Sequence, residues 1–139
     1  MQNTITKVFH IASAHRIKDH ASKCRFLHGH NYMVKMTFLG EINEQGMILD
    51  FKLIKEQIIN KIKDKLDHKC LLEASDPLVT TLKNEKDVPL CLFEKPPTVE
   101  IICQEITTMT RDILKKFEGL SLKSVNMWET KDSGVTVSN

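Results

Sequence analysis

Long apolar runs are missing from this chain of 139 residues. No stretch approaches the roughly 20 apolar residues that a membrane-spanning helix needs, and residues 1–4 lack the charged-then-apolar order of a secretory signal. We therefore expect a cytoplasmic protein. Hydrophobic residues make up 41% of the chain and charged residues 27%, a balance that predicts one folded domain over residues 1–139.

Paired cysteines, a basic block and a glycine-rich nucleotide loop are also absent. The cysteines lie far apart with no C-x-x-C pair, so neither a disulfide framework nor a cysteine-rich zinc knuckle is predicted, and the thiols are by default reduced and structural. A net charge of +2, with Lys and Arg spread along the chain, gives no support to a nucleic-acid partner. The four cysteines are Cys24, Cys70, Cys91 and Cys103.

Four segments have the composition or the alternation of β-strands. Residues 5–14 are rich in strand-forming residues and predict a strand that runs up to His15. Residues 32–39 alternate between apolar and polar faces, and residues 122–130 and 135–138 fit two further strands joined by a polar turn. The apolar face of the second strand consists of Tyr32, Val34, Met36 and Phe38.

Two segments have helical spacing. Asp50 is the predicted N-cap of a helix that extends to Leu66, and Thr98 is the predicted N-cap of a second helix that ends near Gly119. Residues 73–97 contain all four prolines and predict a long ordered loop between the two helices. The apolar stripes are Phe51, Ile54, Ile58, Ile62 and Leu66 in the first helix, and Ile102, Ile106, Met109, Ile113 and Phe117 in the second.

The order strand, strand, helix, helix, strand, strand predicts an α+β fold. It consists of a four-stranded antiparallel sheet with two helices on one face. Such a sheet leaves edge strands that need cover, and the simplest cover is a neighbouring copy of the same chain. We therefore expect a homo-oligomer.

The pattern His28-Gly29-His30, at the entry to the second strand, is the most specific chemical feature. Side chains two apart on a strand point the same way, about 6.5 Å apart along the chain, so both imidazoles can reach one ion. His15, at the end of the preceding strand, can complete a three-histidine set like those of catalytic zinc sites. The alternative is a group of surface or hydrogen-bonded histidines. Two further histidines without such partners, one on a strand surface and one in a solvated loop, are His10 and His20.

Cys24 precedes His28 by four residues and lies between Lys23 and Arg25. Neighbouring cations favour the thiolate, and a thiolate there can act as a base. The same thiol can instead be a loop residue of no consequence, or a fourth ligand that makes a zinc site structural. The spacing does not separate these interpretations.

Asp67 and His68 form an adjacent pair of the kind that builds a general acid or base, although capping or surface roles are common for such pairs. Glu129 is by default a solvent-facing strand residue, and Glu100 lies in the first turn of a helix, where a carboxylate is favoured electrostatically. Trp128 and Met127 are assigned to core packing.

These motifs together resemble the 6-pyruvoyltetrahydropterin synthase and 6-carboxytetrahydropterin synthase family of the tunnelling fold, over nearly the whole chain. No single motif is specific, but their order matches that of the family. The matching segments are Phe9–Ile17, Cys24–His30, Gly46–Phe51, Leu66–His68, Pro97–Glu100 and Trp128–Thr130.

The resemblance implies roles for most of these residues. His15, His28 and His30 are implied as zinc ligands, Cys24 as the catalytic base, Asp67 and His68 as a proton relay, and Glu129 as the anchor of the pterin through two parallel hydrogen bonds. Thr98 and Glu100 are implied in the same pocket. The resemblance also implies trimers whose sheets close a barrel, trimers paired into hexamers, and active sites between subunits.

Three residues between Cys24 and His28 resemble the bacterial 6-carboxytetrahydropterin synthases of queuosine and deazapurine biosynthesis. That resemblance implies conversion of 7,8-dihydroneopterin triphosphate to 6-carboxytetrahydropterin, acetaldehyde and triphosphate. A 6-pyruvoyl enzyme acting on the same substrate and a non-catalytic pterin-binding protein are the alternatives. The chain departs from the family at Leu72 and Ile101, where asparagine is common, and in a C-terminal strand without an aromatic residue.

Overall fold

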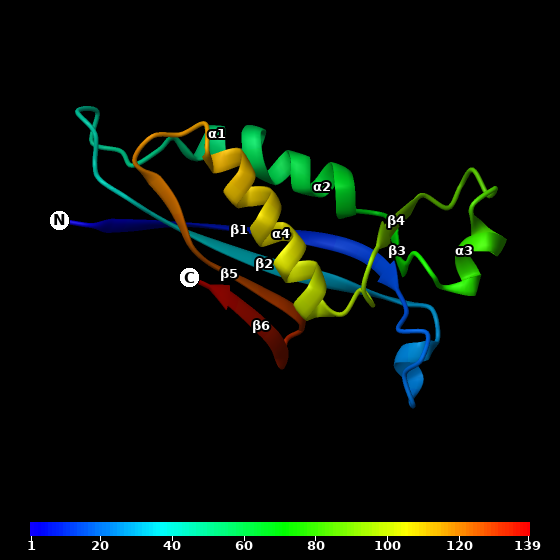
Figure 1. Cartoon of the computed structure of the whole chain (residues 1–139). Coiled ribbons are helices and arrows are strands. Elements are labelled where there is room, and N and C mark those ends of the chain that lie inside the picture. Colours follow the sequence, from blue (N-terminus) through cyan, green and yellow to red (C-terminus); the bar gives the residue numbers. More distant parts are fainter.

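The computed structural model describes residues 1–139 as a six-stranded sheet with the main helices on one face (Figure 1). Its strand order is β4-β3-β1-β2-β5-β6. Strands β1, β2, β5 and β6 pair antiparallel in that order, which confirms the predicted α+β fold and its four antiparallel strands. The bounds of these strands are Asn3–His15 for β1, His28–Gly40 for β2, Leu120–Thr130 for β5 and Ser133–Ser138 for β6.

Two short strands that the sequence did not predict extend the sheet beyond β1. Strand β3 (Cys70–Glu73) runs parallel to β1, and β4 (Leu90–Phe93) runs parallel to β3. The prediction of a loop over residues 73–97 is wrong, because this segment also contains α3 (Pro77–Leu82). Both strands have only four residues, and three consecutive residues of β3 are buried, so no alternation marks them in the sequence.

The first predicted helix forms as α1 (Phe51–Ile54), a π-helical segment η2 (Lys55–Ile59) and α2 (Asn60–Leu66). Asp50 caps it as predicted, because its Oδ1 accepts a hydrogen bond from the Lys52 N–H at 2.9 Å. Phe51, predicted in the buried stripe, is 49% exposed. The π-segment widens the helical turn and turns both Ile58 and Ile59 into the core.

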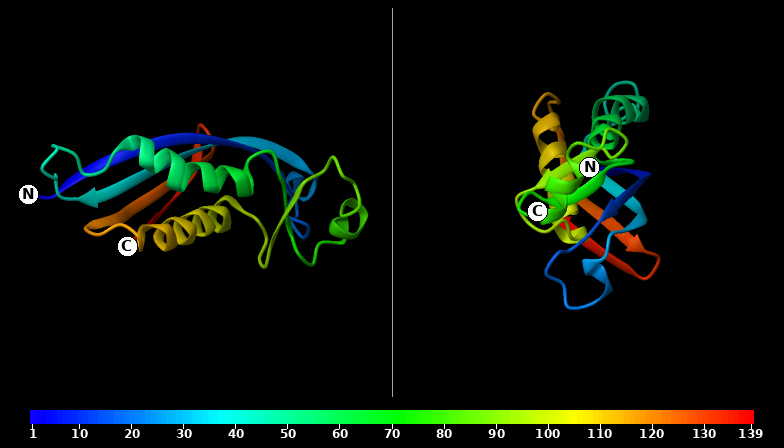
Figure 2. Two further views of the ribbon diagram at one scale, coloured as in Figure 1. Left: turned by 90° about the horizontal axis from the view of Figure 1, so that it is seen from above. Right: turned by 90° about the vertical axis from the view of Figure 1, so that its right-hand side faces the viewer.

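The second predicted helix is α4 (Val99–Leu114), which packs beside α2 against the same face of the sheet (Figure 2). Thr98 caps it by accepting a hydrogen bond from the Ile101 N–H at 3.3 Å. The predicted inward face of β2 is fully buried beneath these helices, and Ile102 and Ile106 pack on it from α4. None of the helices is long and apolar enough to cross a membrane.

Trp128 lies on the sheet face opposite the helices and is 37% exposed, so its assignment to the core is wrong, whereas Met127 is buried as predicted. Alternation along β5 places the two side chains on opposite faces. The indole lies over Gly134 of β6, where a Cβ atom would come within 2.6 Å of the ring. Glycine is therefore required opposite this tryptophan.

An ion pair fixes α3 to the end of β1. The Arg16 guanidinium donates two hydrogen bonds to the buried Asp76 carboxylate, one of them from Nε to Oδ2 at 2.7 Å. Asp76 also caps α3, because it accepts a hydrogen bond from the Leu78 N–H at 2.8 Å. Arg16 therefore holds the pKa of Asp76 below its usual value, although burial opposes the shift.

Replacing Asp76 by Asn is expected to lower the free energy of unfolding by about 2–3 kcal/mol at pH 7, because the guanidinium loses its charged acceptor. A carboxyl whose pKa is lowered in the folded state stabilises the fold above its unfolded pKa of about 3.9 and loses that effect as the pH falls. Urea unfolding of both proteins at pH 7 and pH 3 should show the difference shrinking in acid. A difference that grows in acid contradicts the assignment.

Candidate metal centre and its surroundings

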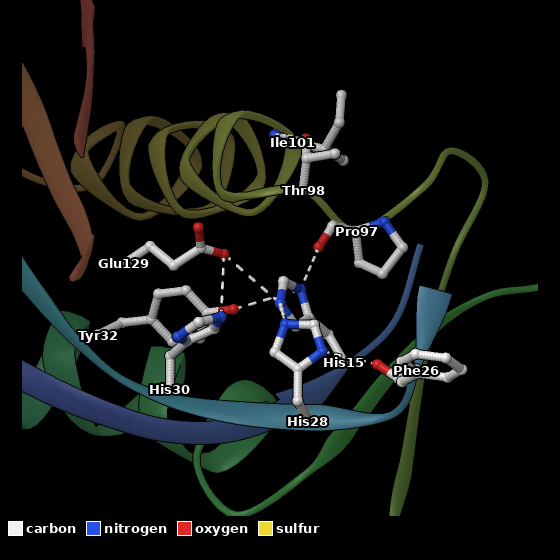
Figure 3. Close-up of polar contacts among 9 residues, drawn as sticks. All are labelled: His15, Phe26, His28, His30, Tyr32, Pro97, Thr98, Ile101 and Glu129. Carbon is white, nitrogen blue, oxygen red and sulfur yellow. Dashed lines mark hydrogen bonds and ion pairs between the residues drawn. The ribbon is translucent and has the colours of Figure 1, made fainter. Parts of the chain in front are cut away.

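Three imidazoles converge at one end of the layer between the sheet and α4 (Figure 3). His15 and His28 are directly opposite in the β1–β2 register, and His30 lies two residues further along β2 on the same face. Their ligand atoms all lie within 4.8 Å of one another. The expectation that β1 and β2 pair and bring these three side chains together is therefore met.

Backbone carbonyls fix which nitrogen of two rings faces the centre. The Nδ1–H of His15 donates to the Pro97 carbonyl at 2.8 Å, and that of His28 donates to the Phe26 carbonyl at 2.6 Å. Their Nε2 atoms are consequently unprotonated in the neutral rings and face each other at 3.1 Å. Metal-binding histidines are commonly oriented by such a hydrogen bond from the other ring nitrogen.

The electrostatics of the rings suit a cation. Burial lowers the pKa of His15, which is 2% exposed, and the neighbouring His28 lowers it further against the opposing effect of the Pro97 carbonyl. Burial also lowers the pKa of His30, whose Nε2 is buried without a hydrogen-bond partner. Neutral imidazole lone pairs directed at one point fit a divalent ion such as zinc and leave a fourth position open.

Tyr32 forms the floor of the centre and was not identified as a site residue from the sequence. It is fully buried on β2, and its hydroxyl lies 3.3 Å from Nδ1 of His15. Burial raises the pKa of Tyr32 above its usual value, so the hydroxyl stays protonated. The period of two from His28 and His30 was the available signal, whereas nothing in the sequence marks the Pro97 carbonyl.

Cys24 lies in the 3-10 turn η1 (Lys23–Arg25) of the β1–β2 connection and is half-buried. Its carbonyl accepts a hydrogen bond from the Ile17 N–H at 2.8 Å, which ties the connection back to the end of β1. The thiol does not belong to the group of side chains close enough to share an ion. This arrangement gives no support to a closed structural site with Cys24 as fourth ligand.

Asp67 and His68 form a hydrogen-bonded pair at the edge of β1. One Asp67 oxygen accepts from the Ala12 N–H at 2.8 Å, and the other lies 2.9 Å from Nδ1 of His68. Burial raises the pKa of Asp67, but these two partners outweigh it and lower the pKa overall. His68 is strained at φ 57° and its side chain is 82% exposed. The pair makes no hydrogen bond or ion pair with the three clustered histidines of the same chain.

Glu129 projects into the centre from β5 rather than into solvent. Its Oε1 lies 3.4 Å from Nε2 of His15 and 3.3 Å from Nε2 of His30 (Figure 3). Thr98 is adjacent to the carbonyl that holds His15, although its hydroxyl oxygen caps α4. Glu100 is exposed in the first turn of that helix, and it makes no hydrogen bond or ion pair with the clustered histidines.

Thiol labelling can check the burial of the other cysteines. Burial raises the pKa of Cys103 to about 11 and also raises those of Cys70 and Cys91. At pH 8 a thiol with a pKa of 11 is ionised to about one part in a thousand. Alkylation followed by peptide mass mapping should therefore modify Cys24 first and Cys103 only after unfolding. Equal rates at these two positions would contradict this description.

The fold and the three-histidine centre define an α+β domain with a candidate metal site between sheet and helices. A family model described as 6-pyruvoyl tetrahydropterin synthase matches residues 4–139, so the chain belongs to this family of enzymes. A probable 6-carboxy-5,6,7,8-tetrahydropterin synthase from Halobacterium salinarum is 31% identical over 121 residues, covering 86% of this chain and 76% of that protein. A 6-carboxy-5,6,7,8-tetrahydropterin synthase from Haemophilus influenzae is 29% identical, covering 93% and 94%.

Solved structures show the same fold at lower identity. An uncharacterised protein from Wolinella succinogenes has a TM-score of 0.84 at 21% identity, and the match covers 100% of this chain and 99% of that one. The 6-pyruvoyl tetrahydropterin synthase of Caenorhabditis elegans has a TM-score of 0.74 at 23% identity, with 100% and 96% covered. The resemblance stated from the motifs is thereby confirmed at the level of family and fold.

Proposed function

We propose that this protein is a zinc-dependent lyase that converts 7,8-dihydroneopterin triphosphate to 6-carboxy-5,6,7,8-tetrahydropterin, acetaldehyde and triphosphate, with consumption of water. The observation that carries the proposal is the convergence of three imidazoles, whose ligand atoms all lie within 4.8 Å of one another and could hold one ion with a fourth position open. The relatives named for this product and the spacing of Cys24 to His28 support the choice of reaction. Queuosine or deazapurine biosynthesis in the cytoplasm is the implied setting.

His15, His28 and His30 would hold the zinc, and zinc there would polarise oxygens on the substrate side chain and stabilise negative charge that develops on them. Cys24 is proposed to remove a side-chain proton. Glu129 is proposed to accept hydrogen bonds from the 2-amino group and the ring N–H of the pterin. Thr98 and Glu100 are proposed to line the same pocket.

Asp67 and His68 are proposed as the proton relay, in which the carboxylate orients and charges the imidazole. Their position at the edge of β1 fits a relay that serves the centre of a neighbouring copy. Strand β1 pairs with β3 only at Ala14 and His15, and β6 ends the sheet on the other side. Two open edges support the proposed homo-oligomer, in which trimers close a barrel and pair into hexamers.

A 6-pyruvoyl product is the second candidate, because the matching family model and the nematode structure carry that name. Both reactions release triphosphate, but only the 6-carboxy reaction cleaves the side chain to acetaldehyde. Mass spectrometry of the pterin product, with acetaldehyde captured separately, distinguishes them. We expect 6-carboxytetrahydropterin and one acetaldehyde per turnover. A pterin product that retains the three-carbon side chain would instead support the 6-pyruvoyl reaction.

A further inference from the structure

The distances around Glu129 resemble the edges of a metal coordination shell. Zinc bonds of about 2.0–2.1 Å to nitrogen and about 2.0–2.2 Å to oxygen, arranged as a tetrahedron, separate neighbouring ligand atoms by about 3.3–3.5 Å. Glu129 Oε1 lies 3.4 Å from Nε2 of His15 and 3.3 Å from Nε2 of His30. The Nε2 atoms of His15 and His28 are 3.1 Å apart.

Hydrogen bonding does not account for the position of this carboxylate. The Nδ1–H of His15 already donates a hydrogen bond to the Pro97 carbonyl. Nε2 of the neutral ring therefore carries a lone pair and cannot donate a hydrogen bond to Glu129. His30 Nε2 also lacks a hydrogen-bond partner, although Glu129 lies 3.3 Å away. A carboxylate beside the Nε2 lone pair of the buried His15 is repelled unless a proton or a metal cation lies between them.

We propose that Glu129 is an exchangeable fourth ligand of the metal held by the three histidines when no substrate is bound. The carboxylate comes within ion-pair distance of His15 and His30 but not of His28, so a rotation of its flexible side chain completes the shell. That side chain is 26% exposed, which leaves room for the rotation. Glu129 itself lies outside the group whose ligand atoms are all within 4.8 Å of one another, so its carboxylate has to move toward His28 to join the three histidines.

The exchange would couple metal coordination to substrate recognition, and this part rests on the proposed function. Glu129 leaves the metal when a pterin offers its N–H groups, and the vacated position becomes available to oxygens of the substrate side chain. The same carboxylate would thereby protect the resting centre from foreign ligands. Binding of the correct heterocycle would open the centre.

Metal binding without any pterin tests the ligand role independently of the proposed reaction. The full chain is loaded with Co²⁺, its visible absorption is recorded, and its affinity is measured by chelator competition for wild type, Glu129→Gln and Glu129→Asp. The control is Glu118→Gln, which removes an exposed carboxylate outside the cluster. We expect Glu129→Gln to bind Co²⁺ about 10-fold or more weakly with a changed visible band, Glu129→Asp to lie between, and the control to match wild type.

Unchanged affinity and an unchanged band in folded Glu129→Gln would overturn the proposal. Circular dichroism establishes folding, and if Glu129→Gln is unfolded, Glu129→Asp decides by the same two readouts. Wild-type behaviour of a folded Glu129→Asp would likewise contradict a ligand role, because its shorter side chain cannot reach the same position. A metal centre that behaves as expected in a protein without turnover would count against the proposed reaction alone.

Discussion

Replacing His28 by Ala is expected to abolish metal retention and to reduce turnover by about 10³-fold or more. Its Nε2 is one of the converging lone pairs, and its Nδ1 bond to the Phe26 carbonyl aims it at the centre. Loss of one ligand removes the metal, which as a Lewis acid supplies several kcal/mol of charge stabilisation, and each 1.36 kcal/mol corresponds to a factor of about 10.

His28 is the informative ligand to replace because it is only half-buried, whereas loss of the buried His15 also disturbs packing. Metal analysis by mass spectrometry and turnover of 7,8-dihydroneopterin triphosphate are measured on the same sample. His20→Ala, in an exposed loop, is the matched control and should behave like wild type. A His28→Ala protein that keeps both its metal and its activity would show that the cluster is not the centre.

Replacing Cys24 by Ala is expected to lower turnover by about 10²–10⁴-fold while the metal content stays unchanged. That range is typical for the loss of a general base. The thiol lies outside the group that can share an ion, so its removal should leave the metal in place. This combination separates a catalytic thiol from a ligand and from an inert loop residue.

Cys91→Ala is the control for the Cys24 experiment, because Cys91 is also a half-buried thiol but lies on β4, outside the cluster. Full activity is expected for this variant. Loss of metal in Cys24→Ala would revive the structural-ligand interpretation. Full activity in Cys24→Ala would assign the proton transfer to another group.

The three-histidine cluster was predictable because residue spacing along a strand determines which way the side chains point. His28 and His30 share a face by their period of two, and the hairpin register brings His15 opposite His28. The two helices were also predictable, since Asp50 and Thr98 cap them as their sequences indicate. In each case the prediction depends on residues close together in the sequence or on one strand pairing, and the structure forms the expected contacts.

Long-range contacts were not predictable in the same way. Strand β3 pairs with β1, and β4 pairs with β3. Segments of four residues carry no alternation that would predict such pairings. Glu129 follows the alternation of its strand, as any residue at that position would. Only the packing of α4 over the sheet shows that its side chain lies on the covered face. His68 lies at an edge that depends on the extended sheet, so nothing in the sequence shows that it makes no hydrogen bond with the clustered histidines of the same chain.

Metal-dependent turnover tests the central claim most directly. The purified protein is stripped with a chelator, reloaded with stepwise Zn²⁺, and assayed at each step with 7,8-dihydroneopterin triphosphate while bound metal per chain is measured. We expect turnover to be absent in the stripped protein, to rise in proportion to bound metal and to level off at about one ion per chain, as a single three-histidine centre requires. Full turnover without metal, or none with the centre filled, would contradict a metal-dependent reaction at these histidines.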